Sequence, residues 1–330
     1  MPRGHYRYTP GCGRCCEDPA QLTHVTTRRL NKSDLSVVWN QDFTVDTVAL
    51  FLNSNSELWV GGISAEDSKL YSSSTGSALS TTLPNANTTA AIYEDSSGNV
   101  YVGEDTKLIK YDNTQTKIWE DTTHDQGVRD IYETASSDIM TLGARFSFAG
   151  DAYKVVKYST AGSVLCTSST LNSLGFSSAT RISLDGNITY AAESSTLLYK
   201  LASDCTTTWT TSNATSLAVF YDSATSRIWT GSNSTGLVDG LIREFDTSGT
   251  LKSSFSHSLG RMPGFARDII VDSDGNIVVV GRGGARKYTT GGTELASFHH
   301  GPVLDTTDNL ARIKQLSGGD YIVTGLRVAL

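Results

Sequence analysis

The sequence of 330 residues lacks any apolar run close to the roughly 20 residues that a membrane-spanning helix requires. Its first ten residues, MPRGHYRYTP, are polar and lack the apolar segment of a secretory signal. We therefore expect no signal peptide and no membrane insertion.

Positive charge is also scarce, because 27 Lys and Arg residues face 34 Asp and Glu residues and the net charge is -7. A chain of this sign has no general attraction to phosphate backbones or to anionic lipid surfaces. Nucleic acid is therefore not an expected partner.

Cysteine is sparse and unevenly spread. Three of the five cysteines lie within Cys12–Cys16, and the other two are Cys166 and Cys205. This pattern does not form a disulfide framework and favours synthesis in a reducing compartment. Cys166 and Cys205 fall in adjacent repeats of the chain, but no feature of the sequence requires a bond between them.

Turn-forming residues and short β-type runs are abundant, and they repeat. The segment ATSLAVFYDSATSRIWTGSNSTGLVDGLIREFDTSGTLKSSF contains four such runs, separated by Gly, Ser, Asn or Asp turns. The four-run order recurs with a period of roughly 40 to 50 residues, which is typical of propeller blades. Seven first strands and seven second strands can be counted, but only six pairs of third and fourth strands follow them.

The missing pair lies at the other end of the chain, in TTRRLNKSDLSVVW at 26–39. We therefore predict an all-β, seven-bladed β-propeller of four-stranded antiparallel blades, closed by two strands from each terminus. The predicted domains are an extended N-terminal arm over 1–23 and the propeller over 24–330. Trp39, Trp119 and Trp209, with Cys166, Phe255 and Phe298 at or near the same position, are expected to pack between blades.

The hairpins KYDNTQTKIW and EFDTSGTLKSSF resemble those of quinoprotein-type and other bacterial YVTN-like β-propeller repeats, over roughly 26–330. The resemblance implies the architecture and names no activity. The Trp-Asp dipeptides of the eukaryotic propeller repeat are absent, and no continuous quinone-binding signature is found.

Ligand-binding loops of propellers are expected at one mouth of the central channel. Candidate ligand or partner contacts there are His299, His300, Arg261 and Arg286. His124, His257, Asp305 and Asp308 also have metal-capable side chains, but without a fixed metal-ligand spacing we favour solvated loop residues. Arg129, Arg181, Arg267 and Arg312 lie on innermost strands, in registers that differ by one residue, so local pairing or solvation inside a wet channel is favoured over ligand capture.

Residues 1–23 differ in composition from the repeats, and we predict that they form an arm that docks onto a protein partner. Candidate docking residues are His5, Tyr6, Tyr8, Cys12, Cys15 and Cys16. Three interpretations stay open for the arm: zinc held by His5 and the three cysteines, a reactive or crosslinking thiol cluster, and simple docking.

Known nucleophile and metalloprotease signatures such as G-x-S-x-G and H-E-x-x-H are absent, so no catalytic residue is assigned. The favoured hypothesis is a non-enzymatic structural or interaction module of a larger assembly. By analogy, the Ser/Thr-rich, Lys-poor composition suggests a phage virion protein of the tail, fibre or capsid-decorating kind that contacts neighbours or a cell-surface receptor. Otherwise we expect a cytoplasmic protein. The alternative is a lyase, a hydrolase or a small-ligand sensor acting at the channel mouth.

Overall fold

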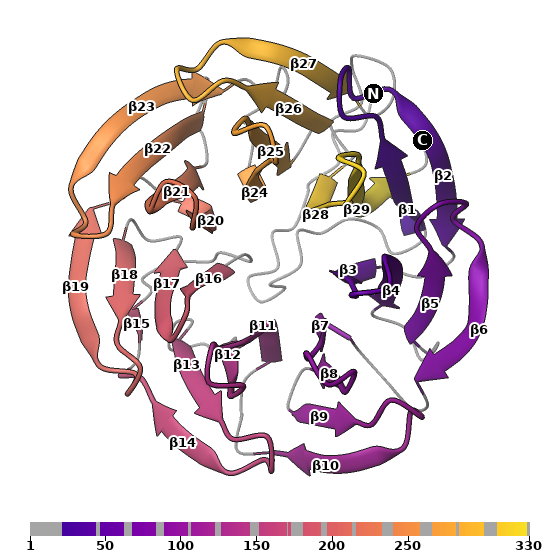
Figure 1. The fold of residues 1–330 in the computed structure, drawn as a ribbon, viewed down its shortest axis with the longest axis vertical. Helices are drawn as coiled ribbons and strands as arrows, with labels where there is room; N and C mark the ends of the chain where they lie inside the picture. Colours follow the sequence, from indigo (N-terminus) through magenta and orange to yellow (C-terminus); the bar gives the residue numbers. More distant parts are fainter. Residues whose placement is uncertain are drawn as a thin grey trace, which may run out of the picture.

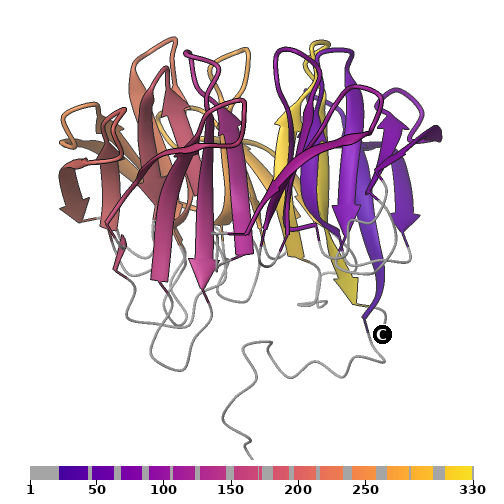
Figure 2. The same cartoon turned by 90° about the horizontal axis from the view of Figure 1, so that it is seen from below.

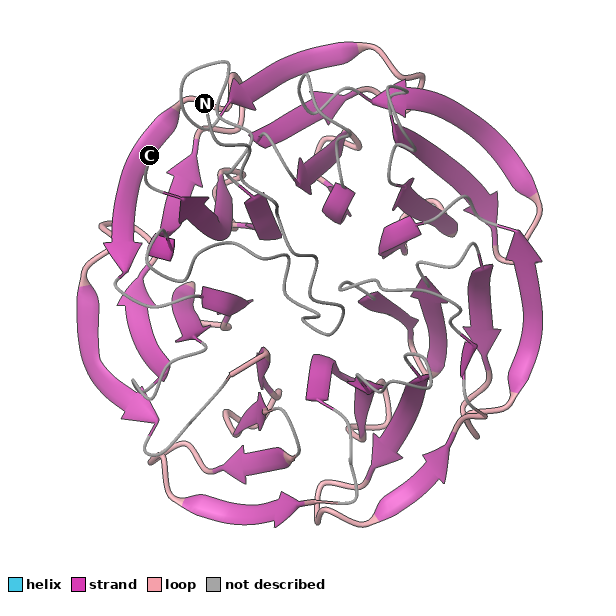
Figure 3. Cartoon of the chain, turned by 180° about the vertical axis from the view of Figure 1, so that it is seen from behind, coloured by secondary structure: helices cyan, strands magenta, loops and turns pink. Residues whose placement is uncertain are grey.

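A computed structural model of the chain describes residues 22–43, 47–62, 68–83, 89–104, 107–122, 127–145, 152–169, 171–172, 181–192, 197–212, 216–232, 240–257, 266–281, 284–299 and 309–328. The regular elements in these ranges are all β-strands, as Figure 3 shows by colour, and they form seven antiparallel sheets. The sheets surround a central axis as seven blades (Figure 1), which confirms the predicted fold. Within these ranges, no helix is long and apolar enough to cross a membrane.

Blades are numbered in chain order from the first complete one, and each runs from an innermost first strand to an outermost fourth strand. Blade 1 contains β3 (Thr47–Leu52), β4 (Glu57–Gly62), β5 (Ser68–Ser72) and β6 (Ala78–Leu83). Blade 2 contains β7 (Ala91–Glu94), β8 (Val100–Gly103), β9 (Leu108–Tyr111) and β10 (Lys117–Asp121). Blade 3 contains β11 (Gly127–Glu133), β12 (Ile139–Arg145), β13 (Ala152–Tyr158) and β14 (Val164–Thr167).

The next three blades follow the same order. Blade 4 contains β16 (Arg181–Asp185), β17 (Ile188–Ala192), β18 (Leu197–Leu201) and β19 (Thr207–Ser212). Blade 5 contains β20 (Ser216–Asp222), β21 (Arg227–Ser232), β22 (Gly240–Asp246) and β23 (Leu251–His257). Blade 6 contains β24 (Ala266–Val271), β25 (Ile277–Gly281), β26 (Gly284–Tyr288) and β27 (Glu294–His299).

Blade 7 closes the ring with strands from both ends of the chain. Its inner strands are β28 (Asn309–Gln315) and β29 (Tyr321–Val328), and its outer strands are β1 (Leu22–Leu30) and β2 (Val37–Phe43). β1 pairs with β29 along its length, and at the centre of this pairing the Thr27 hydroxyl donates to the Thr324 hydroxyl at 3.1 Å. This confirms the predicted closure by two strands from each terminus.

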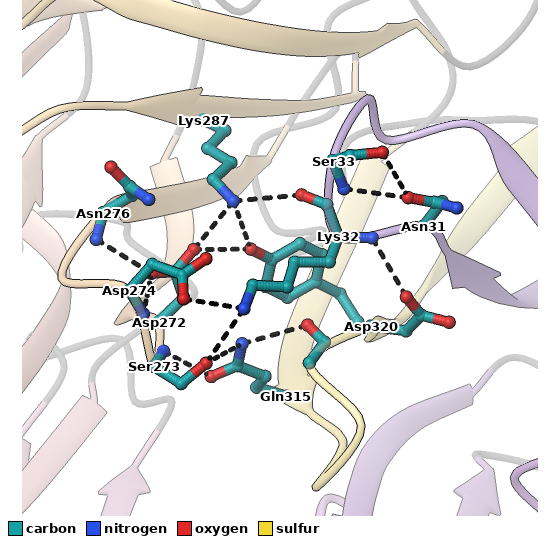
Figure 4. A network of polar contacts seen from close by, with 12 residues as sticks. Asn31, Lys32, Ser33, Asp272, Ser273, Asp274, Asn276, Lys287, Gln315 and Asp320 are labelled. Carbon is teal, nitrogen blue, oxygen red and sulfur yellow. Dashed lines mark hydrogen bonds and ion pairs between the residues drawn. The ribbon is translucent and has the colours of Figure 1, made fainter.

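A buried polar network fastens blade 7 to blade 6 (Figure 4). The Lys287 ammonium of blade 6 lies 2.9 Å from the Asp272 carboxylate and donates to the Tyr321 hydroxyl and to the Lys32 carbonyl, both at 3.0 Å. Tyr321 in turn donates to Asp272 at 2.7 Å. Lys32 also pairs with Asp274 at 2.7 Å, so the N-terminal half of blade 7 is tied directly to its neighbour.

The hydrophobic core lies between the blades rather than within them. The described residues form seven buried clusters, and each cluster joins two adjacent blades. Trp59 of blade 1 packs with Ile92 of blade 2 in one of them, and Tyr101 of blade 2 with Val128 of blade 3 in another. Because second strands are covered on both faces, β8 and β25 are buried at every position, and their sequences are continuously apolar.

Tight turns connect the first strand to the second and the third to the fourth, and Figure 2 shows these described turns on one face of the disc. In the sequence DSSGN, the Asp95 carboxylate accepts the backbone N–H groups of Ser97 and Asn99. Gly98 adopts a φ of 81°, which glycine tolerates at low cost. DSSGN and the equivalent DSDGN at 272–276 are therefore hairpin turns.

Two features of the region between blades 3 and 4 were not predicted. A short strand, β15 (Leu171–Asn172), pairs with β13, and Leu171 is buried in the core cluster shared by these blades. A disulfide joins Cys166 of β14 to Cys205 in the turn that precedes β19.

Candidate functional site

On the seven innermost strands, one set of residues is equivalent by its pairing with the second strands. The side chains at this position form a ring around the axis. From blade 1 to blade 7 this axial ring consists of Ala49, Ala91, Asp130, Arg181, Ala218, Asp268 and Arg312. Two carboxylates and two guanidinium groups make the ring electrically neutral, and all four are largely buried. Because four buried charged side chains share one level of the inner strands, we treat this ring as the candidate site.

Arg312 reaches from blade 7 to blade 3, which lie on opposite sides of the axis in Figure 1. Its Nη1 lies 3.2 Å from the Asp130 carboxylate, and its Nη2 donates to the Arg129 carbonyl at 2.8 Å. Both charged side chains are only 7% exposed. One arginine therefore bridges the central channel with two contacts.

The two carboxylates of the axial ring also bind the backbone of the following blade. Asp130 accepts the N–H of Ile182 in blade 4 at 3.1 Å, and Asp268 accepts the N–H of Ile313 in blade 7 at the same distance. An ionised carboxylate that is hydrogen-bonded in this way stays charged at lower cost in a buried position. Each aspartate thus joins two blades at the inner rim.

A second layer of the channel lies two residues along the innermost strands, nearer the turns. Phe51, Tyr93 and Tyr132 form a row of aromatic rings, with centroids 4.6 Å and 6.0 Å apart. The Lys314 ammonium of blade 7 lies 5.7 Å from the Tyr132 ring centroid, so this contact also crosses from blade 7 to blade 3.

Burial dominates the electrostatics of this site. Removal from water, followed by repulsion from Arg312, lowers the pKa of Arg181 to about 10, which leaves the guanidinium charged at neutral pH. Burial lowers the pKa of Lys314, and burial and the nearby Asp130 raise the pKa of Tyr132, which stays neutral. At neutral pH, Arg181 is therefore charged and Tyr132 is neutral at the inner rim.

The space left within the cluster is small. A cavity of about 20 Å³ is lined by side chains from blades 1, 2, 3 and 7, including Tyr93, Asp130, Tyr132, Arg312 and Lys314. This volume accommodates one water molecule, whereas sites for drug-sized ligands occupy roughly 300 to 1,000 Å³. The described side chains of blades 1, 2, 3 and 7 therefore leave room for little more than water between them.

The predicted register of the four channel arginines is confirmed. Arg181 and Arg312 belong to the axial ring, whereas Arg129 and Arg267 lie one residue earlier on their strands, next to Asp130 and Asp268. The partner of Asp130 is nevertheless Arg312, which is 182 residues away, and the sequence contains no signal for that pairing.

Of the four predicted contact residues of the channel mouth, the structure describes the side chain of Arg286 alone. Arg286 is buried on β26, the third strand of blade 6, where its Nε lies 3.6 Å from a Glu294 carboxylate oxygen. The backbone of His299 pairs with Gly284 at the end of β27. The side chain of His299, together with Arg261, His300, His124, Asp305 and Asp308, lies outside the described residues.

His257, which also has a metal-capable side chain, is buried at the end of β23 and has a packing role. Its Nε2 lies 3.1 Å from the Ser232 carbonyl oxygen. A Cβ atom at Gly240 would come within 2.3 Å of the same nitrogen, so glycine is needed there to make room for the ring. His257 thus contributes to packing in blade 5.

The predicted arm residues His5, Tyr6, Tyr8, Cys12, Cys15 and Cys16 lie outside the described residues. Within the described ranges, no group of three or more His, Cys, Asp or Glu side chains is arranged to hold a metal ion. Zinc in the arm therefore stays a prediction.

Solved structures similar to this chain are β-propellers of low sequence identity. The WD40 β-propeller domain of Doa1 aligns with a TM-score of 0.64 and 13% identity over 93% of this chain and 97% of that one. A streptogramin B lyase aligns with a TM-score of 0.64 and 12% identity over 93% of this chain and 99% of that one. A catalytically inactive virginiamycin B lyase from Staphylococcus aureus with quinupristin aligns with a TM-score of 0.63 and 12% identity over 92% of this chain and 100% of that one. No protein-family model and no curated protein sequence matches the chain. At this identity the likeness shows a seven-bladed β-propeller fold and nothing finer.

Proposed function

We propose that this chain is a rigid, non-enzymatic interaction module that joins a larger protein assembly through residues 1–23. The observation that carries the proposal lies at the axis, where Arg312 contacts Asp130 and Lys314 contacts Tyr132 across the channel. These groups stabilise the disc, and a rigid disc presents its surface to a partner at little cost in ordering.

A phage virion is the assembly that we propose, as a tail, fibre or capsid-decorating component with loops that contact neighbours or a cell-surface receptor. The Ser/Thr-rich, Lys-poor composition supports this analogy, and the hairpin resemblance to quinoprotein-type and YVTN-like repeats is compatible with a bacterial or phage source.

The test is to follow the chain through gradient purification of particles from its source. The full chain should co-sediment with particles, whereas a variant that lacks residues 1–21 should fold, because β1 stays intact, and remain in the soluble fraction. Equal co-sedimentation of both forms would refute docking through the arm. Absence of the full chain from particles would refute the virion role.

The alternative is a propeller lyase, hydrolase or ligand sensor at the channel mouth that uses His299, His300 or Arg261, because the fourth predicted residue, Arg286, is buried on the third strand of blade 6. Because two similar structures are lyases by name and one of them contains quinupristin, incubation with quinupristin is the first assay. Enzyme-dependent conversion of quinupristin, detected by chromatography, would replace the favoured proposal.

A further inference from the structure

The outer rim of the propeller is fastened by one recurring contact between adjacent blades. An aromatic side chain on the outermost strand of one blade packs against a glycine in the last turn of the next blade. The pairs are Trp39 with Gly76, Trp119 with Gly162, Trp209 with Gly249 and Phe255 with Gly292, and each glycine has a positive φ. Each indole N–H also donates to a carbonyl oxygen of that turn, at 3.0 to 3.2 Å.

The boundary between blades 3 and 4 has the same geometry with different residues. Cys166 occupies the position of the tryptophan, since it pairs with Lys157 as Trp119 pairs with Lys110. Cys205 occupies the position of the glycine and has a φ of 64°. A disulfide between these cysteines replaces the aromatic contact and its hydrogen bond.

A second rim contact is also different at this boundary. Lys110 of blade 2 and Lys200 of blade 4 each donate to a turn carbonyl oxygen of the following blade at 3.0 Å. The equivalent Lys157 of blade 3 instead pairs with Asp138 of its own blade at 2.9 Å. At the outer rim between blades 3 and 4, the disulfide thus takes the place of two non-covalent contacts, the aromatic contact with a glycine and the hydrogen bond from a lysine to a turn carbonyl oxygen.

Contacts nearer the axis do not depend on the disulfide. The Asp130 carboxylate accepts the Ile182 N–H, and the Ser136 hydroxyl donates to the Asn187 side-chain oxygen at 3.0 Å. Loss of the disulfide should therefore loosen the outer rim of this boundary while the inner rim holds the ring closed.

We propose that the Cys166–Cys205 disulfide is a redox-controlled lock on the outer rim between blades 3 and 4, opened by a dithiol reductant. Cys166 lies on an outermost strand and is half-buried, so a reductant can reach it, whereas Cys205 is buried. A dithiol thiolate attacks one sulfur to give a mixed disulfide, and its second thiol displaces the protein thiol. The two cysteines gain two electrons and two protons, and the dithiol becomes a disulfide.

The experiment compares oxidised protein with dithiothreitol-reduced protein by hydrogen-exchange mass spectrometry. It uses a background in which Cys12, Cys15 and Cys16 are replaced by Ser, so that only the rim disulfide responds. Peptides covering 164–169 and 202–207 should exchange at least tenfold faster after reduction. Peptides at the Trp119–Gly162 boundary should be unchanged, and the melting temperature should fall by about 5 °C for a crosslink between residues 39 apart.

Two variants in the same background decide the interpretation. Cys166→Ser with Cys205→Ser should exchange like the reduced protein under both conditions. Cys166→Trp with Cys205→Gly installs the contact found at three other boundaries and should exchange slowly under both conditions. Should this pair not fold, the serine pair still decides the question.

Three results would overturn the proposal. They are a peptide map of the oxidised protein without the Cys166–Cys205 crosslink, equal exchange before and after reduction, and a serine pair that exchanges as slowly as oxidised protein.

Discussion

Replacing Asp130 by alanine tests whether the cross-axis pair stabilises the ring. The substitution leaves the Arg312 guanidinium, which is 7% exposed, without its carboxylate, and it removes the acceptor of the Ile182 N–H. Breaking a buried ion pair on one side costs about 3–5 kcal/mol, because the remaining charge is buried without compensation. We expect Asp130→Ala to lower the free energy of unfolding by that amount.

Removing both charges should cost far less. In Asp130→Asn combined with Arg312→Met, neither charge of this pair remains, and the asparagine oxygen can still accept the Ile182 N–H. Replacing a buried pair by groups of similar volume is often neutral or stabilising, so we expect a change within about 1 kcal/mol of the wild type. The matched control is Lys117→Ala, which breaks an ion pair whose side chains are 54% and 38% exposed and should change stability by less than about 1 kcal/mol.

The assay is equilibrium urea unfolding followed by far-ultraviolet circular dichroism and tryptophan fluorescence, with coincident transitions as the requirement for a free energy. The reasoning is refuted if Asp130→Ala costs no more than Lys117→Ala. It is equally refuted if the double variant loses as much stability as the single variants Asp130→Asn and Arg312→Met together, since the pair would then have no coupling energy.

Three further predictions concern separate features. Although burial acts to raise it, hydrogen bonds from a tyrosine and a lysine hold the pKa of Asp272 below its ordinary value. The stability that ionised Asp272 contributes is therefore present above about pH 4 and is lost as pH falls through the lowered pKa of the folded state. Asp272→Asn should flatten the loss of stability in acid, measured by urea midpoints from pH 5 to 2. Gly249→Ala should lower the free energy of unfolding by about 2 kcal/mol, because a Cβ would lie 3.1 Å from the Trp209 ring at a φ of +86°. Gly275 has a φ of +79° and open space around it, so Gly275→Ala should cost only about 1 kcal/mol. Equal losses of stability in thermal or urea unfolding would contradict the packing role of Gly249. If the arm binds zinc, elemental analysis of the full chain should give one metal per chain, and none after replacement by Ser of Cys12, Cys15 and Cys16.

The fold was predictable because each blade repeats the same local pattern. Turn sequences such as DSSGN and DTSG mark every hairpin, and continuously apolar second strands indicate sheets that are covered on both faces. The excess of first and second strands over third and fourth strands also predicted the shared blade 7.

The candidate site was only partly predictable, because its contacts cross the ring. The pattern of Arg129, Arg181, Arg267 and Arg312 gave the correct register, but the pairing of Arg312 with Asp130 depends on which blades face each other across the axis. The Cys166–Cys205 bond was missed for a related reason. Recognising it requires matching Cys205 to the glycine position of the sister turns, an equivalence that the backbone φ and the hydrogen bond from the Cys205 N–H to the Ala202 carbonyl show in the structure.

The most direct test of the closed ring is a crosslink between its two ends. Thr27 and Thr324 face each other on β1 and β29, with their hydroxyl oxygens 3.1 Å apart. In a variant that carries Thr27→Cys and Thr324→Cys, mild oxidation should give a disulfide within one chain, detected by peptide mapping, and the protein should keep its native circular dichroism spectrum. Absence of this crosslink, or its formation only between two chains, would contradict a propeller closed by both termini.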